Sequence, residues 1–309
     1  MLNRNQLFPL ILLCLPPSVA LGEAAQCPAN SVTVHYHSLD GSQMAISVSI
    51  NHSGPYDFMV DTGAQITVMD SDIAADLNLP SQGSISVVSF VNDASAGLVK
   101  PELVETGPVA VHNLPVVVEA LDQIHALNPK VRGILGENFL GRFDLLIDYG
   151  HRIICFDESR SMQEQMQGER IPVLQRQGLT GDLAYTLPLQ ITVHLSGDGK
   201  RGTVLRVDSG GQVPILFDKR LAPLWWLGCN HEQQGNVLTK EGGVLVFGAI
   251  PDQNVRIGSR TTRQITFMAP ICTSGRRIPR AGEDGLLPTR LFKKVFISYT
   301  DHFVMFDPH

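Results

Sequence analysis

Two short segments of the 309-residue chain carry residue types suited to acid–base catalysis. Asp61 begins an Asp-Thr-Gly tripeptide and Asp208 begins an Asp-Ser-Gly tripeptide, and each follows a run of apolar residues. One such tripeptide alone is a common turn between strands, because Asp and Gly are favoured in turns. Two of them at matching places in a repeated sequence predict that two carboxyl groups meet in one site.

The repeat extends well beyond the tripeptides. The segment YDFMVDTGAQITVMD matches TVLRVDSGGQVPILFD, and farther along Gly97 matches Gly243. A third segment, GILGENFLGRFDLLIDYGHRIICFD, resembles DGLLPTRLFKKVFISYTDHFVMFD near the end of the chain. Because the three landmarks recur in the same order, the sequence predicts two similar lobes in one chain.

Pairing of such lobes about a pseudo-twofold axis would place the two turns face to face, with one water between the carboxylates. Like charges this close cannot both ionise, so the pair keeps one proton and acts as general base and general acid together. The hydroxyls of Thr62 and Ser209 are expected to bond across the axis to the main chain of the opposite lobe. Gly63 and Gly210 allow the tight backbone. This chemistry requires no metal or organic cofactor.

Composition narrows the classes of function. The chain is 43% hydrophobic and 17% charged, with a formal charge of -6. These values argue against a disordered polyelectrolyte and against a nucleic-acid-binding surface. Residues 1–22 have the basic start, apolar run and small residues of a secretory signal peptide, and the run is too short and too rich in proline for a membrane span. We therefore expect an exported protein, periplasmic or extracellular.

Signal cleavage would leave Cys27, Cys155, Cys229 and Cys272, an even number that predicts two disulfides in an exported protein. Cys27 precedes the first strand of the first lobe and Cys155 lies in its last strand, so these two are expected to pair. Cys229 and Cys272 would then form the second bond. None of the four belongs to a Cys-x-x-Cys pair, so the cysteines predict no metal site.

Alternating runs such as MAISVSI and LQITVHL predict a chain made mostly of strands. Short helices are expected after Ser71 and Lys219 and in the segments ENFLGR and TRLFKK. The polar stretch ESRSMQEQMQGER lacks apolar periodicity and is interpreted as a linker. The expected organisation is a signal peptide at 1–22, a first lobe at 23–157, a linker at 158–182 and a second lobe at 183–309.

With these motifs the chain resembles the pepsin-like and retropepsin-like aspartic proteases. The DTGA segment and the motif Ile134, Leu135, Gly136 make the first lobe similar to a bacterial exported retropepsin, and the second lobe to a diverged duplicate. The resemblance implies an all-β, bilobal fold of two retropepsin-like β-barrel lobes. It also implies an aspartic endopeptidase that cleaves polypeptide substrates through a dyad of Asp61 and Asp208. A monomer is expected, because both acids are in one chain.

The resemblance further implies a glycine-tipped flap in each lobe, with Gly97 and Gly243 as the candidate tips. In pepsin-like enzymes a Ser or Thr usually follows each tripeptide, whereas this chain has Ala64 and Gly211. Neither can donate a side-chain hydrogen bond to a carboxylate, so the dyad is expected to titrate at higher pH and to work best in mild acid. Pro288 replaces the family's glycine in the second lobe. It favours the alternative hypothesis, a catalytically degenerate peptide-binding or scaffolding module.

Overall fold

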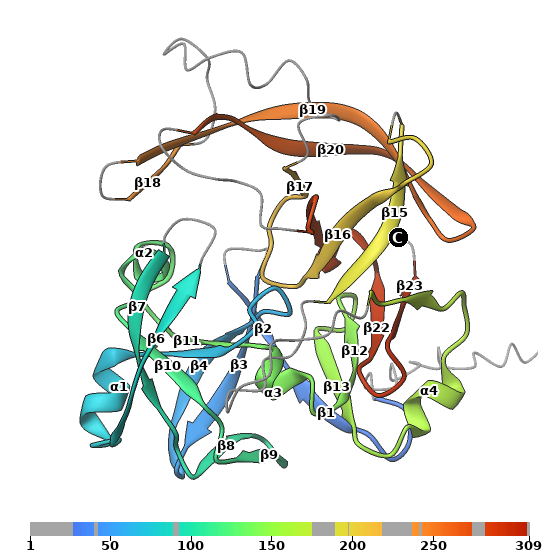
Figure 1. Cartoon of the computed structure of the whole chain (residues 1–309). Coiled ribbons are helices and arrows are strands. Elements are labelled where there is room, and N and C mark those ends of the chain that lie inside the picture. The colour runs from blue at the N-terminus through green and yellow to red at the C-terminus, as the bar shows by residue number, and fades with distance from the viewer. Residues whose placement is uncertain are drawn as a thin grey trace, which may run out of the picture.

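The computed structural model describes residues 27–39, 43–88, 93–174, 189–196, 198–217, 237–240, 243–273 and 282–307. They form three β-sheets with a few short helices (Figure 1), which confirms the predicted all-β class. Within these residues no helix has the length and apolar character needed to cross a membrane. The predicted signal peptide, the helix expected after Lys219 and the cysteine at position 229 lie outside the described residues.

The first half of the chain builds a ten-stranded sheet in which β11 runs between β4 and β5. β11 is parallel to β4 and antiparallel to β5, so the chain threads back between two strands that it has already formed. This crossing sets Leu135 beside Val60, at the end of β4. The strands are β2 (His37–Leu39), β3 (Gln43–Ile50), β4 (Ser53–Val60), β5 (Thr67–Asp70), β6 (Ser81–Val88), β7 (Asp93–Val99), β8 (Leu103–Thr106), β9 (Val109–His112), β10 (Val116–Glu119) and β11 (Val131–Leu135).

The second half builds a seven-stranded sheet with the same crossing. β21 runs between β16 and β17, parallel to the first and antiparallel to the second. The long β19–β20 hairpin extends across the top of Figure 1. The repeat seen in the sequence is thus a repeat of topology. The strands are β15 (Gln190–Leu195), β16 (Thr203–Asp208), β17 (Ile215–Leu216), β18 (Val237–Lys240), β19 (Gly243–Ile257), β20 (Arg260–Thr273) and β21 (Gly285–Pro288).

A third, six-stranded sheet is shared by the two halves and holds them together. Its central contact pairs β12 with β22 in antiparallel register, with Leu146 opposite Phe296. Every residue of β12 and β13 is buried, as expected for strands covered on both faces. The sheet order is β1 (Val32–His35), β13 (Ile153–Asp157), β12 (Asp144–Asp148), β22 (Lys294–Ser298), β23 (Phe303–Asp307) and β14 (Ile171–Pro172).

Helices are short and lie mainly near the predicted places. α1 (Ser71–Asp76) and α3 (Glu137–Leu140) fall in the expected segments, and the TRLFKK segment holds a 3₁₀ helix, η1 (Thr289–Leu291). α2 (Asp122–Leu127) follows β10. α4 (Ser161–Gln165) lies in the predicted linker.

The predicted linker is more ordered than its polar composition indicates. Over its described part, residues 158–174, it forms α4 and β14, and β14 pairs with β23 of the shared sheet. Met162 is fully buried, and its main-chain N–H donates to the Asp157 carboxylate at 2.6 Å. A single buried methionine among polar residues produces no periodic pattern, so its contribution to packing was not visible in the sequence.

The expected disulfide between Cys27 and Cys155 is present, with a Cα–Cα distance of 5.6 Å. It ties the segment before β1 to β13, the strand with which β1 pairs. The second expected pairing, Cys229 with Cys272, cannot be described because it involves a residue outside the described part of the chain.

The structure places Gly97 differently from the sequence prediction. Gly97 was expected at the tip of a hairpin, but it lies within β7, where Ser84 of β6 and Val118 of β10 are its partners on either side. The pairing of β6 with β7 continues past Gly97 as far as Val88 and Asp93. Gly243 is the first residue of β19 and pairs with Lys240, the last residue of β18.

Candidate active site

The two Asp-[Ser/Thr]-Gly turns meet where the halves join. Asp61 directly follows β4 and Asp208 ends β16, and their carboxyl groups lie side by side, since a Cβ atom built at Gly63 would be 2.8 Å from Oδ1 of Asp208 and 3.0 Å from Oδ1 of Asp61. A Cβ atom built at Gly63 would lie 2.8 Å from Cγ of Asp208, and one built at Gly210 would lie 2.5 Å from Cγ of Asp61. Each turn therefore presses against the aspartate of the other half, and only glycine leaves room for that approach.

Thr62 and Ser209 tie the two turns together with four hydrogen bonds. The Thr62 hydroxyl donates to O of Val207 at 2.9 Å, and the Ser209 hydroxyl donates to O of Val60 at 2.9 Å. Each hydroxyl also accepts the main-chain N–H of the other residue, both at 3.0 Å. Both side chains are buried, so these bonds have little competition from water. The cross-axis bonds expected from the sequence are present.

Main-chain donors hold each carboxylate in place. Gly63 donates its N–H to Oδ1 of Asp61 at 2.7 Å, and Gly211 donates its N–H to Oδ1 of Asp208 at 2.8 Å. Asp61 itself donates its main-chain N–H to O of Leu135, so β11 supports the turn from below. The carboxyl groups are oriented by backbone rather than by mobile side chains.

Burial and proximity make the two acids unequal. Burial, and then the charge of Asp61, raise the pKa of Asp208 well above its usual range. Burial also raises the pKa of Asp61, but the Gly63 N–H opposes this rise. Asp208 is only 7% exposed, whereas Asp61 is half-buried. Both carboxyl groups therefore have pKa values above the usual Asp range, and they titrate together as one pair.

Removing the acid at position 208 is expected to stabilise the fold near neutral pH. A carboxyl whose pKa is raised by folding contributes stability below its unfolded pKa, and this contribution is lost as the pH rises through the folded pKa. Asp208→Asn should therefore raise the Tm at pH 7 by a few degrees, with a smaller difference near pH 4. Thermal unfolding at both pH values measures this. A variant with a lower Tm than wild type at pH 7 would contradict the pKa direction.

Three buried charged residues near the dyad were missed in the sequence. Nη1 of Arg206 donates to O of Gly63 at 2.6 Å, and the same guanidinium pairs with Glu283. Glu137, at the start of α3, is fully buried, and burial raises its pKa well above the usual range. The hydroxyl of Tyr299 donates to its Oε1 at 3.4 Å. A charge inside an otherwise apolar strand, as in TVLRVD, was the available signal for Arg206.

Pro288 fits its place without disturbing the second turn. It ends β21 in register with Asp208, and its φ of -61° is the value that proline requires. At the equivalent place in the first half, a Cβ on Gly136 would lie 2.6 Å from the backbone of Ile66. The two halves therefore differ in local packing, while β21 and β11 keep the same position between their neighbours.

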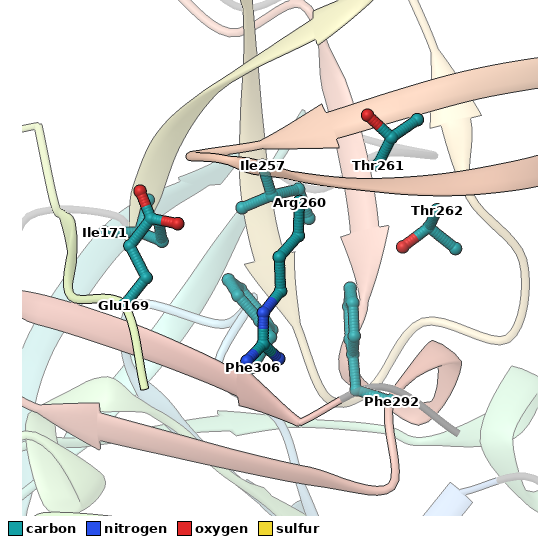
Figure 2. A pocket seen from close by; sticks show the side chains of 8 residues that line it. All are labelled: Glu169, Ile171, Ile257, Arg260, Thr261, Thr262, Phe292 and Phe306. Carbon is teal, nitrogen blue, oxygen red and sulfur yellow. The ribbon is translucent and has the colours of Figure 1, made fainter. Parts of the chain in front are cut away.

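Away from the dyad, a cavity of about 270 Å³ opens between the start of β14, the β19–β20 turn and the C-terminal strands (Figure 2). Arg260 reaches into it toward Phe306. Glu169 at its rim accepts hydrogen bonds from the N–H and hydroxyl of Ser259. None of its lining residues belongs to the two turns. The described residues contain no group of three or more potential metal ligands.

Comparison with known proteins finds a family match over the part of the chain that contains the first catalytic turn. Residues 46–142 match the sequence model of the gag-polyprotein putative aspartyl protease family. A retropepsin-like aspartic protease from Rickettsia conorii aligns at 22% identity over 41% of this chain and 89% of its own, with a TM-score of 0.30. No curated protein matches the chain. The matched residues 46–142 include Asp61 and the Ile134, Leu135, Gly136 motif, which confirms the resemblance to retropepsin-like aspartic proteases.

Proposed function

We propose, from the retropepsin-like aspartic protease character of this chain, that it is an endopeptidase in which Asp61 and Asp208 together activate a water molecule. The observation that carries the proposal is the close approach of two carboxyl groups, one from each half of a repeat, whose pKa values burial raises. Such a pair holds one proton and can serve as base and acid at once.

One proton on the pair leaves one acid as the base and the other as the acid, and we propose Asp61 as the base. Ionised Asp61 takes a proton from water as the water oxygen bonds to the peptide carbonyl carbon, and Asp208 gives its proton to the carbonyl oxygen. The tetrahedral intermediate then collapses, the C–N bond breaks, and the proton held by Asp61 passes to the leaving nitrogen. Transfer of the intermediate's hydroxyl proton back to Asp208 restores the starting state.

The peptide-binding alternative gains little from this site. A module that only binds peptide has no need for a buried acid next to a half-buried one, because their desolvation and mutual repulsion destabilise the fold. Pro288, the residue that favoured the alternative, is accommodated in β21. The Cys27–Cys155 disulfide supports an exported location, since such bonds persist in oxidising compartments.

Digestion of denatured casein tests the proposal. The wild-type protein should release peptides whose new termini, read by mass spectrometry, lie inside the casein chains. Cleavage confined to chain ends would indicate an exopeptidase. The absence of any cleavage across mildly acidic and neutral pH would favour the binding module.

The pH profile of kcat/KM is expected to be bell-shaped, with an acidic limb above the usual Asp value of about 3.9. Burial raises both carboxyl pKa values, and activity needs exactly one proton on the pair. Ala64→Thr adds a hydroxyl that can donate to the ionised form, so its acidic limb should move to lower pH. Ala64→Val is the control, because valine has nearly the same shape as threonine but lacks the hydroxyl. Equal movement in both variants would exclude the hydrogen-bond explanation.

A further inference from the structure

The glycine carbonyls of the two catalytic turns are each bonded by a side chain from the opposite half. Nε2 of Gln43 donates to O of Gly210 at 2.9 Å, and Nη1 of Arg206 donates to O of Gly63 at 2.6 Å. The acceptors are equivalent in the repeat, but the donors are not. One is a neutral amide and the other is a permanently charged guanidinium.

Strand register locates this difference within the repeat. Thr62 and Ser209 are 147 positions apart, and the same spacing sets Arg206 on Met59. Ala45 pairs with Met59 between β3 and β4, and Gln190 pairs with Arg206 between β15 and β16, so Gln190 takes the place of Ala45. Gln190 donates its Nε2–H to Glu283 at 3.1 Å. The second half therefore has a polar cluster of Arg206, Glu283 and Gln190 next to the first turn.

The first half shows that the fold does not need a charge at this place. The same spacing sets Arg206 on Met59, which is buried in an apolar cluster together with Val131. Val131 and Glu283 each lie two residues before the matching glycines of β11 and β21. An apolar pair thus occupies one half where the other has a buried ion pair. Because burying an ion pair costs desolvation energy, the charge requires an explanation other than packing.

The guanidinium is held rigidly. Its side chain is 6% exposed and that of Glu283 is 3% exposed. Nε donates to Oε2 of Glu283 at 2.9 Å and Nη2 donates to the same oxygen at 2.5 Å, while Nη1 bonds Gly63. Arg206 and Asp208 are two residues apart in one strand, so their side chains lie on the same face of the sheet.

We propose that Arg206 is a positioning residue of the dyad, which anchors the first catalytic turn through Gly63 and places a fixed positive charge beside the two aspartates. Its effect on catalysis rests on the proposed protease function. Its effect on the titration of the two carboxyl groups does not, because that titration occurs whether or not a peptide is cleaved.

The charge of Arg206 acts on the pKa values of the carboxyl groups around it, and its sign fixes the direction. The charge of Arg206 lowers the pKa of Asp61, of Asp208 and of Glu137, against the larger upward effect of burial. Without that charge, all three carboxyls should hold their protons to higher pH. Among the described residues, the ionisable groups that face this region are Asp61 after β4, Asp208 in β16, Glu137 in α3, Glu283 before β21, Tyr149 after β12 and Tyr299 after β22.

Three variants separate the effect of the Arg206 charge from the effect of its hydrogen bond to Gly63. The double variant Arg206→Met with Glu283→Val copies the apolar pair of the first half, so no buried charge is left unpaired. Its acidic limb of kcat/KM should rise by about one pH unit. Arg206→Lys keeps the charge, but it cannot bond Glu283 and Gly63 with the same fork. Its acidic limb should stay within about 0.3 units while kcat falls about tenfold.

Gln43→Leu is the matched control, because it removes the equivalent bond to Gly210 without changing a charge. It should lower kcat and leave the acidic limb in place. A limb that moves as far in Gln43→Leu as in the double variant would overturn the charge effect, and an unchanged kcat in Arg206→Lys would overturn the anchoring role. The kcat of Arg206→Lys still tests the anchoring role if the double variant does not fold.

Carboxyl ¹³C NMR titration provides the readout that is independent of activity. The dyad signals, assigned with Asp61→Asn and Asp208→Asn, should titrate at higher pH in the double variant than in wild type. An inactive wild type with that upward shift would reject the protease proposal and retain the role of Arg206 in dyad titration. An active wild type whose double variant shows neither a moved limb nor a moved titration would reject the role of Arg206 alone.

Discussion

Asp61→Asn is expected to lower kcat for peptide hydrolysis by at least about 10³-fold, because asparagine cannot accept the proton of the attacking water. Asp208→Asn should cause a loss of similar size, since the carbonyl oxygen then lacks its acid. The two losses should not add in the double variant, because one pair performs a single proton transfer cycle. Initial rates on a peptide identified from the casein digest measure each loss.

Asp72→Asn is the control for these variants, because Asp72 is an exposed acid on α1 outside the site. It should retain wild-type kcat. Circular dichroism should show that all three single variants are folded. Full activity in either dyad variant would mean that the chemistry lies elsewhere in the chain, whatever the geometry of the two turns.

The second large effect is expected on stability, from the Cys27–Cys155 disulfide. The bond closes a loop of 128 residues that contains the whole ten-stranded sheet, so its removal frees a long segment of the unfolded chain. Replacing both cysteines with alanine should lower the free energy of unfolding by about 3–5 kcal/mol. Fully buried Cys155 also loses its sulfur contacts in the core.

Guanidinium unfolding of wild type and the double alanine variant measures this loss. Wild type kept in reductant is the comparison that removes the crosslink but keeps the side chains. If the crosslink matters most, the unfolding midpoint of the reduced wild type should be closer to that of the variant than to that of the oxidised wild type. An unfolding midpoint shared by oxidised wild type and the variant would show that the bond does not stabilise the fold.

Local patterns in the sequence were enough to predict the strands, most of the short helices, the duplicated topology and the two turns that meet. Apolar alternation determines which face of a strand is buried, and a repeated pattern produces the same crossing of strands twice. The roles of Thr62 and Ser209 also followed, because symmetry relates each to a turn of the other half.

Only the tertiary structure decided which distant groups meet. Arg206 and Glu283 are 77 positions apart, and Arg206 and Gly63 are 143 apart, so no local pattern joins them. Gly97 was misplaced because a glycine within a long strand and one at a turn look alike in sequence, and the register of β6 and β7 settles the difference. Chain periodicity specifies local backbone and burial, whereas an ion pair or a paired register depends on how separate strands are brought together.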